Sequence, residues 1–325
     1  MITEYYLGID IGGTKCAVIA GMENMEILDK AGFPTATQKG PDHAINLLLN
    51  KAEALTQKPG LTDLKVIGIS CGGPLDSKKG IVQSPPNLPG WDNIPIVQLF
   101  NDKFNVPVYL QNDANACALA EWKFGAGKGT DNMVFLTFGT GMGAGIIING
   151  RLYSGTNDLA GEVGHIRLAD DGPEAYGKKG SFEGFCSGTG IARLARKIAL
   201  EKITAKEQVS FCDNIDGIDN ITTKDIAEAA SRGDKVALEI FEISGTHLGK
   251  GLAILIDILN PQKIVIGSVY ARCRQFLEPA CLKVIEQEAL EPARAVCSIV
   301  PAALGEEVGD YASLSVAMIA GNKDY

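Results

Sequence analysis

The strand–turn–strand pattern of residues 5–20, YYLGIDIGGTKCAVIA, constrains the fold more than any other stretch of the chain. Apolar residues alternate with glycine or aspartate over 7–12, which predicts a strand with one apolar face, and 17–20 resume β character. Gly12 and Gly13 interrupt the two strands and let another group approach the backbone closely. With Asp10, Thr14 and Lys15 around it, this turn is suited to holding phosphate groups on its N–H groups. An ordinary β-hairpin is the alternative, because paired glycines are common in tight turns.

The same pattern occurs a second time, about 125 residues later. A predicted strand over 132–138 ends in the glycine-rich run 139–145, and β-prone residues follow at 146–148. Thr137, Gly139, Thr140 and Gly141 correspond to the glycines and hydroxyl of the first turn. Two such units indicate an internal duplication, with two related half-domains facing one nucleotide. A dinucleotide-binding fingerprint is disfavoured, because its glycines open a helix rather than a strand.

Length and composition predict an ordinary soluble protein of two domains. The chain has 325 residues, of which 46% are hydrophobic and 21% charged, and a single core seldom grows that large. The net charge of −9 argues against nucleic acid as a partner, because phosphate backbones attract clustered cations. Nucleotide binding survives this objection, because backbone N–H groups and a divalent metal can hold a few phosphates.

The cysteine pattern and the lack of targeting signals predict a cytoplasmic location. The eight cysteines are scattered singly and form no CxxC pair, which suits reduced thiols. Residues 1–20 lack the pattern of a signal peptide, and no stretch approaches the length of a transmembrane helix. We therefore expect a cytoplasmic protein with no membrane partner.

Several polar residues follow predicted strands, where α/β sheets tend to bind ligands. A strand over 65–70 runs into Gly73, and the Pro-rich loop 84–92 carries Asn87, whose amide suits a polyhydroxyl ligand. A strand over 107–110 delivers Asn112 and Asp113 just before a predicted helix over 114–124. Asp113 has two compatible interpretations. It is suited to cap this helix, and it is suited to act as a general base towards a hydroxyl.

A second polar group follows in two glycine-rich loops. Glu162 and His165 stand three residues apart in 155–168, where both could bind sugar hydroxyls or His165 could bind a metal. Glu183 lies in the next glycine-rich loop. The rest of the chain alternates predicted helices and strands, which favours an α/β architecture. The helices are expected at 42–56 (with Asp42 as N-cap), 188–201, 223–231, 234–259, 270–289 and 309–319, and the further strands at 26–29, 263–266 and 296–300.

Taken together, six motifs in this order resemble the ROK family of sugar kinases and related transcriptional repressors, over nearly the whole chain. They are Asp10-x-Gly-Gly-Thr-Lys, Gly72-Gly73-Pro74, Pro86-Asn87-Leu88-x-Gly90-Trp91, Asn112-Asp113-Ala114-Asn115, Thr137-x-Gly-Thr-Gly141-x-Gly143 and Glu162-x-Gly-His165. The resemblance implies the actin-like ATPase (ribonuclease H-like) fold, with two α/β domains and a cleft between them. We expect a smaller domain at 1–113 plus 308–325 and a larger one at 114–307.

The resemblance also implies roles for individual residues. Asp113 would be the catalytic base, Gly267 would lie near the adenosine, and Asp10 would orient Mg²⁺ through water. The ATP phosphates would be bound by Gly12, Gly13, Thr14, Lys15, Thr137, Gly139, Thr140 and Gly141. The sugar would be bound by Gly73, Asn87, Asn112, Asp113, Glu162, His165 and Glu183. The expected function is an ATP- and Mg²⁺-dependent kinase for a hexose or N-acetylhexosamine, acting on the 6-OH, and relatives of this kind are often homodimers.

Two departures from the family pattern matter. Many members carry CxCGxxGCxE, whose three cysteines bind structural zinc with the histidine of ExGH. Alignment on Gly177, Gly180 and Glu183 puts Glu174, Tyr176 and Ser181 at the three cysteine positions, so we predict no zinc. The second departure is Ser268, where relatives often have a further glycine near the adenosine.

Two other functions stay open. A sugar-responsive regulator or non-catalytic sugar-binding protein would share the scaffold, but the repressor branch carries an N-terminal helix-turn-helix, for which the residues before the first strand leave no room. A phosphotransferase acting on a carboxylate would not need Asn87 or the Glu162–His165 pair.

Overall fold

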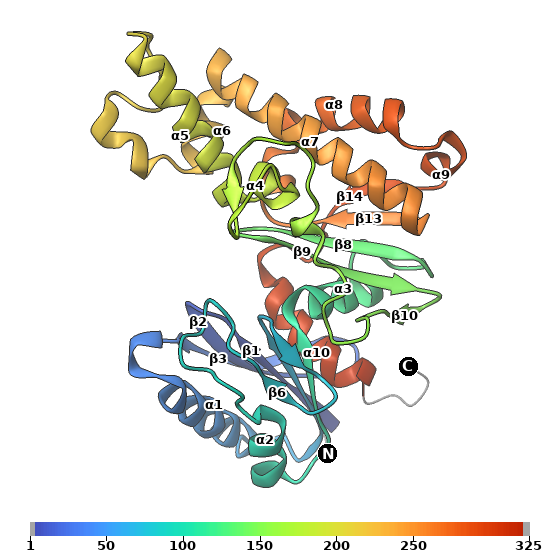
Figure 1. The fold of residues 1–325 in the computed structure, drawn as a ribbon. Helices are drawn as coiled ribbons and strands as arrows, with labels where there is room; N and C mark the ends of the chain where they lie inside the picture. Colours follow the sequence, from blue (N-terminus) through green and yellow to red (C-terminus); the bar gives the residue numbers. More distant parts are fainter. Residues whose placement is uncertain (1–3, 321–325) are drawn as a thin grey trace. The chain divides into compact units, whose positions relative to one another are not determined.

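The structure is a computed structural model that describes residues 4–320, so the outermost ends of the predicted smaller domain lie outside the described residues. It contains two compact units. The first comprises Met1–Asp131, Gly145–Ala160 and Ala303–Tyr325, and the second comprises Asn132–Ala144 and Gly161–Ala302. Figure 1 shows the helices and strands of both units.

A five-stranded mixed sheet of order β3-β2-β1-β4-β7 forms the centre of the first unit. β1 (Glu4–Ile11), β2 (Lys15–Gly21) and β3 (Ile27–Pro34) form an antiparallel meander, so the predicted first hairpin is confirmed. β4 (Asp63–Cys71) and β7 (Val108–Asn112) continue the sheet in parallel. The short strands β5 (Leu75–Asp76) and β6 (Ile81–Val82) pair outside this sheet.

The two faces of this sheet are covered by different helices because side chains alternate along each strand. Leu7 and Ile9 belong to an apolar core that includes residues of α1 (Pro41–Thr56) and α2 (Ile96–Phe104). On the opposite face, Gly8 lies against α10 (Val308–Ala320), where an added Cβ would come within 2.4 Å of the Ser313 hydroxyl oxygen. The predicted cap of the first helix is wrong: Gly40 is the N-cap, and Asp42 lies in the first turn.

The second five-stranded sheet has the order β10-β9-β8-β13-β14. Its strands are β8 (Met133–Phe138), β9 (Met142–Ile148), β10 (Arg151–Leu152), β13 (Lys263–Ile266) and β14 (Ser298–Pro301). In both sheets the third, second, first, fourth and fifth strands of the set follow one another across the sheet. This shared order is what the predicted internal duplication requires.

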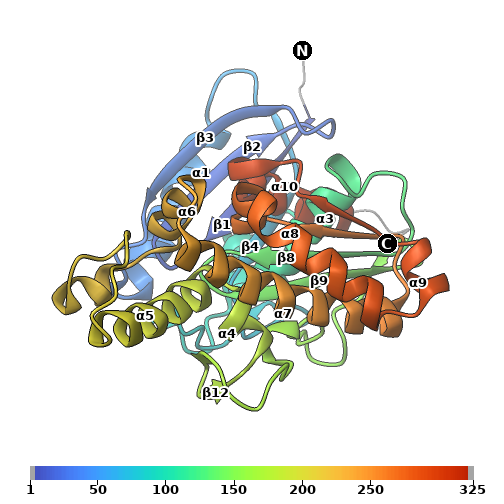
Figure 2. The same cartoon turned by 90° about the horizontal axis from the view of Figure 1, so that it is seen from above.

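Helices make up most of the second unit. They are α4 (Phe182–Cys186), α5 (Gly188–Thr204), α6 (Thr223–Ser231), α7 (Lys235–Leu259), α8 (Val269–Glu288) and α9 (Glu291–Ala295). α7 and α8 lie side by side (Figure 2). Gly249 permits this contact, because an added Cβ there would lie 2.5 Å from the Cys281 carbonyl oxygen. Within residues 4–320, no helix combines the length and hydrophobicity needed to cross a membrane.

The compact units differ from the predicted domain bounds, because the first unit continues through α3 (Asp113–Phe124) and takes in 145–160. Gly145 lies against α3, where an added Cβ would come within 2.4 Å of the Ala118 Cβ. The buried Glu121 carboxylate of α3 accepts hydrogen bonds from the Ala303 and Leu304 backbone N–H groups at 3.2 and 2.8 Å. These contacts attach both segments to α3, and sequence patterns do not report such long-range packing.

Candidate functional site

The first glycine turn joins β1 to β2 and lies against the Pro-rich loop. Gly12 N–H donates to the Lys15 carbonyl oxygen at 3.1 Å, which closes the turn. A Cβ added at Gly13 would lie 2.6 Å from the Asn87 carbonyl oxygen, so the two backbones touch. Thr14 and Lys15 are exposed on this turn. The structure therefore brings the predicted phosphate turn and one predicted sugar-binding residue together.

Two parallel strand ends bring further predicted residues to the same part of the first unit. β4 and β7 end side by side, with Cys71 paired with Asn112. A Cβ added at Gly72 would lie 3.3 Å from the Asn87 amide oxygen, and one added at Gly73 would lie 3.1 Å from the Asn112 amide nitrogen. Both asparagine amides thus line the glycine turn that follows β4.

Asp113 is the first residue of α3, and the prediction that it caps this helix is wrong. The N-cap is Asn112, whose side-chain oxygen accepts from Ala114 N–H at 2.9 Å. An oxygen of the Asp113 carboxylate also accepts from this N–H group, at 2.8 Å. The carboxylate is exposed. Asp113 is thus an exposed residue at the helix start whose carboxylate shares the Ala114 N–H group with the Asn112 cap, and a base towards a substrate hydroxyl needs such an exposed position.

Asp10 lies among other carboxylates of the first unit. Burial raises its pKa to about 7, and the negative charges of Asp310 and Asp113 add to this shift, while Lys15 and Lys30 oppose it. Lys30 pairs with the buried Asp310 at 2.6 Å. Sequence reasoning missed this pair, because Lys30 and Asp310 are far apart in the chain, and only the position of Asp310 at the start of the last helix hinted at a role.

The second glycine turn joins β8 to β9, and β9 begins at Met142, inside the glycine run. Gly143 N–H donates to the Thr137 hydroxyl at 2.8 Å, and Gly139 N–H donates to the Gly141 carbonyl oxygen at 3.2 Å. The start of α5 contacts the turn as well: Thr189 donates its hydroxyl to the Thr140 carbonyl oxygen at 2.7 Å. The turn is thus fixed from both sides.

Glu183 connects this turn to the segment that carries Glu162 and His165. It is buried in the first turn of α4, and its carboxylate accepts from Met142 N–H at 3.0 Å. A Cβ added at Gly164 would lie 3.4 Å from the same carboxylate oxygen. Glu162 and His165 are exposed at the two ends of a 3₁₀ helix, Val163–His165. The second unit therefore gathers three predicted sugar-binding residues near the second turn.

A pocket of about 540 Å³ opens beside the second turn. Its lining includes Gly139, Thr140, Thr189, Arg196, Ser268 and Arg272. Gly267 immediately precedes Ser268 in the chain, and the Gly267 N–H group donates to the Leu136 carbonyl oxygen at 3.0 Å. Ser268 has a φ of 53°, a conformation that favours glycine, at the position where the sequence departs from the family pattern. The predicted adenosine position thus borders a pocket next to the predicted phosphate turn.

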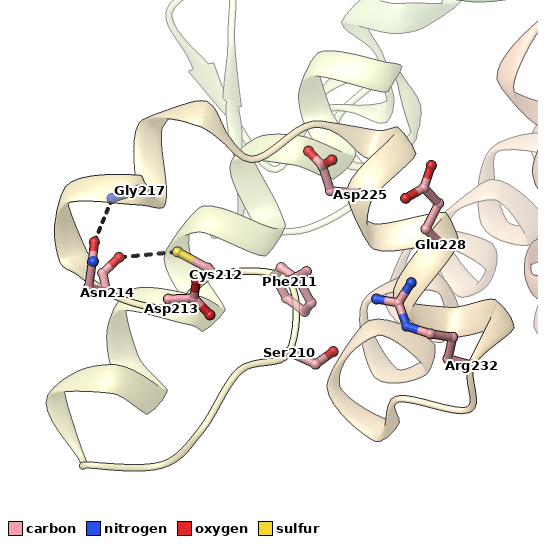
Figure 3. Close-up of a pocket in the computed structure, with 9 residues that line it drawn as sticks. All are labelled: Ser210, Phe211, Cys212, Asp213, Asn214, Gly217, Asp225, Glu228 and Arg232. Atoms are coloured by element: carbon pink, nitrogen blue, oxygen red, sulfur yellow. Dashed lines mark hydrogen bonds between the residues drawn. The ribbon is translucent and has the colours of Figure 1, made fainter.

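Another pocket, of about 440 Å³, lies in the helical part of the second unit, and no prediction fell on it (Figure 3). Asp225, Glu228, Arg232 and Cys212 are among its lining residues. Asp225 belongs to the capping box of α6, and the Cys212 thiol donates to the Asn214 carbonyl oxygen at 3.2 Å. Those two polar groups therefore serve local structure.

The three positions that the family pattern assigns to zinc-binding cysteines do not form a zinc donor set. The Ser181 hydroxyl accepts from Gly184 N–H at 3.1 Å as the N-cap of α4, and the Tyr176 ring lies against His165. Within residues 4–320, no cluster of three or more histidine, cysteine, aspartate or glutamate side chains is arranged to hold a metal ion. The prediction that the protein binds no zinc remains to be tested.

A model of the ROK family matches residues 6–316, and the chain belongs to this family. It is 36% identical over 274 residues to a glucokinase of Halalkalibacterium halodurans, covering 82% of this chain and 81% of the relative. It is 31% identical over 293 residues to the DNA-binding transcriptional dual regulator NagC of Escherichia coli K12, covering 89% of this chain and 69% of the regulator. The relatives of this chain therefore include a glucokinase and a transcriptional regulator.

The solved structures agree with this assignment. A ROK family glucokinase from Streptomyces griseus, in complex with glucose and AMPPNP, superposes with a TM-score of 0.76 at 30% sequence identity, covering 96% of this chain and 99% of that one. The predicted fold class, a two-domain α/β protein of the actin-like ATPase type, is confirmed.

Proposed function

We propose that this protein is an ATP-dependent sugar kinase that transfers the γ-phosphoryl group to the 6-OH of a hexose or N-acetylhexosamine. The observation that carries the proposal is the exposed position of Asp113 at the start of α3, next to Asn112, which caps the helix. Similarity to glucokinases supports it, as does a solved relative that binds glucose and an ATP analogue.

In this proposal each group has one task. Asp113 accepts the proton of the attacking hydroxyl, while Asn87, Asn112, Glu162 and His165 bind the other hydroxyls and orient the sugar. Gly73 lets the sugar approach the backbone beside Asn112. The Asn112 amide oxygen is already used by the helix cap, so its nitrogen is the atom that remains for the ligand. The family resemblance assigns Glu183 to the sugar, but the Glu183 carboxylate is buried and accepts from Met142 N–H, so in this proposal it keeps the second turn and the 161–165 segment in register.

The donor phosphates are assigned to the two glycine turns, because glycine lets a phosphate approach the backbone closely. The Gly12, Gly139 and Gly143 N–H groups bond within the turns, so the phosphates are assigned to the remaining N–H groups of the turns. Asp10 fits a magnesium ion, because this metal binds one or two carboxylates together with substrate phosphates. A cation at this position would also stabilise the negative charges of Asp310 and Asp113, which raise the Asp10 pKa. When bound, Mg²⁺ neutralises charge that develops on the phosphates. Gly267 borders the pocket assigned to the adenosine.

The similarity to NagC favours one rival, a sugar-responsive regulator without kinase activity. A coupled assay of ADP release separates the two functions over a panel of glucose, N-acetylglucosamine, N-acetylmannosamine, mannose, fructose and allose. We expect ADP release with at least one sugar, and a kcat lowered by about 10²–10⁴ in Asp113→Ala, with sugar binding retained. Asp102→Ala, which removes an exposed carboxylate of α2, is the matched control.

Two results would contradict the proposal. Sugar binding without ADP release across the panel would favour the regulator, and near-normal turnover in Asp113→Ala would remove Asp113 from the role of base. The expected homodimer and cytoplasmic location stay predictions.

A further inference from the structure

A small β-hairpin packs beside His165 in the second unit. It consists of β11 (Glu174–Ala175) and β12 (Lys178–Lys179), joined by Tyr176 and Gly177. Both turn residues have positive φ, 48° and 67°, which is typical of the tight two-residue turns that match the twist of a hairpin. The turn presents the Tyr176 ring to the His165 ring, with centroids 5.4 Å apart and planes inclined by 37°.

The same hairpin also binds the backbone around His165. Lys178 donates from Nζ to the His165 carbonyl oxygen at 2.7 Å, and Arg167 donates from Nη1 to the Lys179 carbonyl oxygen at 2.8 Å. On its other strand, the Glu174 carbonyl oxygen accepts from Arg193 of α5 at 2.6 Å. These three bonds fix the hairpin to the 165–167 segment and to α5, and the Tyr176 ring, at a residue that is 67% exposed, contacts His165 from the turn.

An exposed histidine without such a neighbour would sample several orientations. Ordering a side chain on binding costs conformational entropy, and a ring contact that already holds the imidazole reduces this cost. His165 is exposed and ends a short 3₁₀ helix, so its own segment gives the ring little support. Tyr176 supplies the contact on the ring, and Lys178 supplies the contact on the backbone.

We infer that Tyr176 and Lys178 are positioning residues that hold His165 in the orientation required to bind the sugar. The inference rests on the proposed role of His165 in sugar binding. Because the two residues act on His165 before the ligand arrives, their effect falls on sugar affinity and leaves the phosphoryl transfer step nearly unchanged.

The variants are chosen so that the hairpin itself survives. Tyr176→Asn removes the ring but keeps a residue that tolerates positive φ, and Asn-Gly is a favoured sequence for this kind of turn. Tyr176→Phe keeps the ring and loses only the hydroxyl. Lys178→Met removes the bond to the His165 carbonyl oxygen. The matched control is Lys179→Met, because the Lys179 side chain is exposed and has no hydrogen bond or ion pair among the described residues.

Two measurements on the full-length protein test the inference. The first is the ¹H–¹³C spectrum of the three histidines (His43, His165 and His247) in protein labelled at histidine, with His165 assigned from His165→Gln. The second is the dissociation constant of glucose, or of the panel sugar that binds most tightly, by isothermal titration calorimetry without nucleotide, together with kcat and KM. The spectrum needs no ligand, so it reports on the hairpin even if the proposed function fails.

We expect the His165 ring signal to shift in Tyr176→Asn and to stay near its wild-type position in Tyr176→Phe and Lys179→Met. The sugar dissociation constant should rise about three- to tenfold in Tyr176→Asn and Lys178→Met, with kcat within about twofold of wild type. The inference is overturned if Tyr176→Asn leaves both the His165 signal and the sugar affinity unchanged, or if Lys179→Met weakens sugar binding as much as Lys178→Met does. If His165 shifts as expected but no sugar binds to the wild-type protein, the proposed function fails while the positioning contact stands.

Discussion

The backbone of Gly13 lies directly against Asn87, so that a Cβ at position 13 would be 2.6 Å from the Asn87 carbonyl oxygen and 2.9 Å from its Cβ. This contact joins the predicted phosphate turn to the loop that carries a predicted sugar-binding amide. The need for glycine is spatial here, because any side chain at this position would push the two segments apart.

Gly13→Ala should therefore destabilise the protein and weaken its hold on the donor. Overpacking of this kind typically costs about 1–3 kcal/mol of the free energy of unfolding, measured here by urea denaturation, and we expect the KM for ATP to rise at least about tenfold. Gly32→Ala in β3 is the control, because its added Cβ would have its nearest neighbour at 3.9 Å. Equal stability and equal KM in the two variants would show that the contact has no role.

Asp10→Asn should raise the melting temperature of the metal-free protein at pH 8 by a few °C. The folded protein keeps the Asp10 proton up to about pH 7, whereas the unfolded chain releases it near pH 4. The folded state therefore binds more protons between these values, and stability falls as the pH rises through this window. Asparagine removes the buried charge, so the gain should be largest at pH 8 and shrink as the pH falls towards 4.

Asp29→Asn provides a control of opposite sign for that experiment. A hydrogen bond from Lys58 lowers the Asp29 pKa, so its carboxylate stabilises the fold above its ordinary pKa and loses this contribution as the pH falls. We expect no gain in melting temperature for this variant at pH 8. The melting temperatures are measured by scanning calorimetry. A gain in melting temperature for Asp10→Asn that is the same at pH 8 and pH 5 would contradict the elevated Asp10 pKa.

Glu121→Ala should be among the most destabilising single changes in the first unit. The carboxylate is fully buried and accepts from the N–H groups of Ala126, Ala303 and Leu304 at 2.8, 3.2 and 2.8 Å. Bonds to a charged group contribute about 1.5–3 kcal/mol each and are not additive, so we expect a loss of about 3–5 kcal/mol in urea denaturation. Glu53→Ala breaks an exposed pair with Lys103 and should cost less than about 1 kcal/mol. Similar losses in the two variants would refute the role of Glu121.

Because we predict that the protein binds no zinc, treatment with a metal chelator should leave the fold unchanged. Because the Ser181 hydroxyl caps α4 and Tyr176 contacts His165, the 170–187 loop is held without a metal. Dialysis against a strong chelator should not shift the melting temperature, and elemental analysis of the purified protein should give far less than one zinc per chain. A stoichiometric zinc together with a lower melting temperature after chelation would show that other groups replace the missing cysteines.

The local patterns of the sequence determined most of the longer elements of this protein and the order in which they occur, but they did not predict α2. Alternation around the two glycine turns predicted both hairpins, and helical periodicity placed α6 and α7 within a residue of their observed bounds. Short-range competition was harder to resolve, because Asn112 and Asp113 are both good capping residues, and which one caps α3 depends on the path of the chain as it leaves β7. The motifs alone also led to the correct family.

Tertiary structure decided which distant groups meet. Three contacts join residues that no periodicity relates. They are the Lys30–Asp310 ion pair, the hydrogen bonds from the 303–304 backbone to Glu121, and the contact of the hairpin with His165. The pKa of Asp10 depends on the same kind of proximity, because burial and neighbouring acids set it, whereas its own position in the sequence does not. A sequence specifies propensities over a few residues, but the electrostatics and the space available at a site come from the packing of elements far apart in the chain.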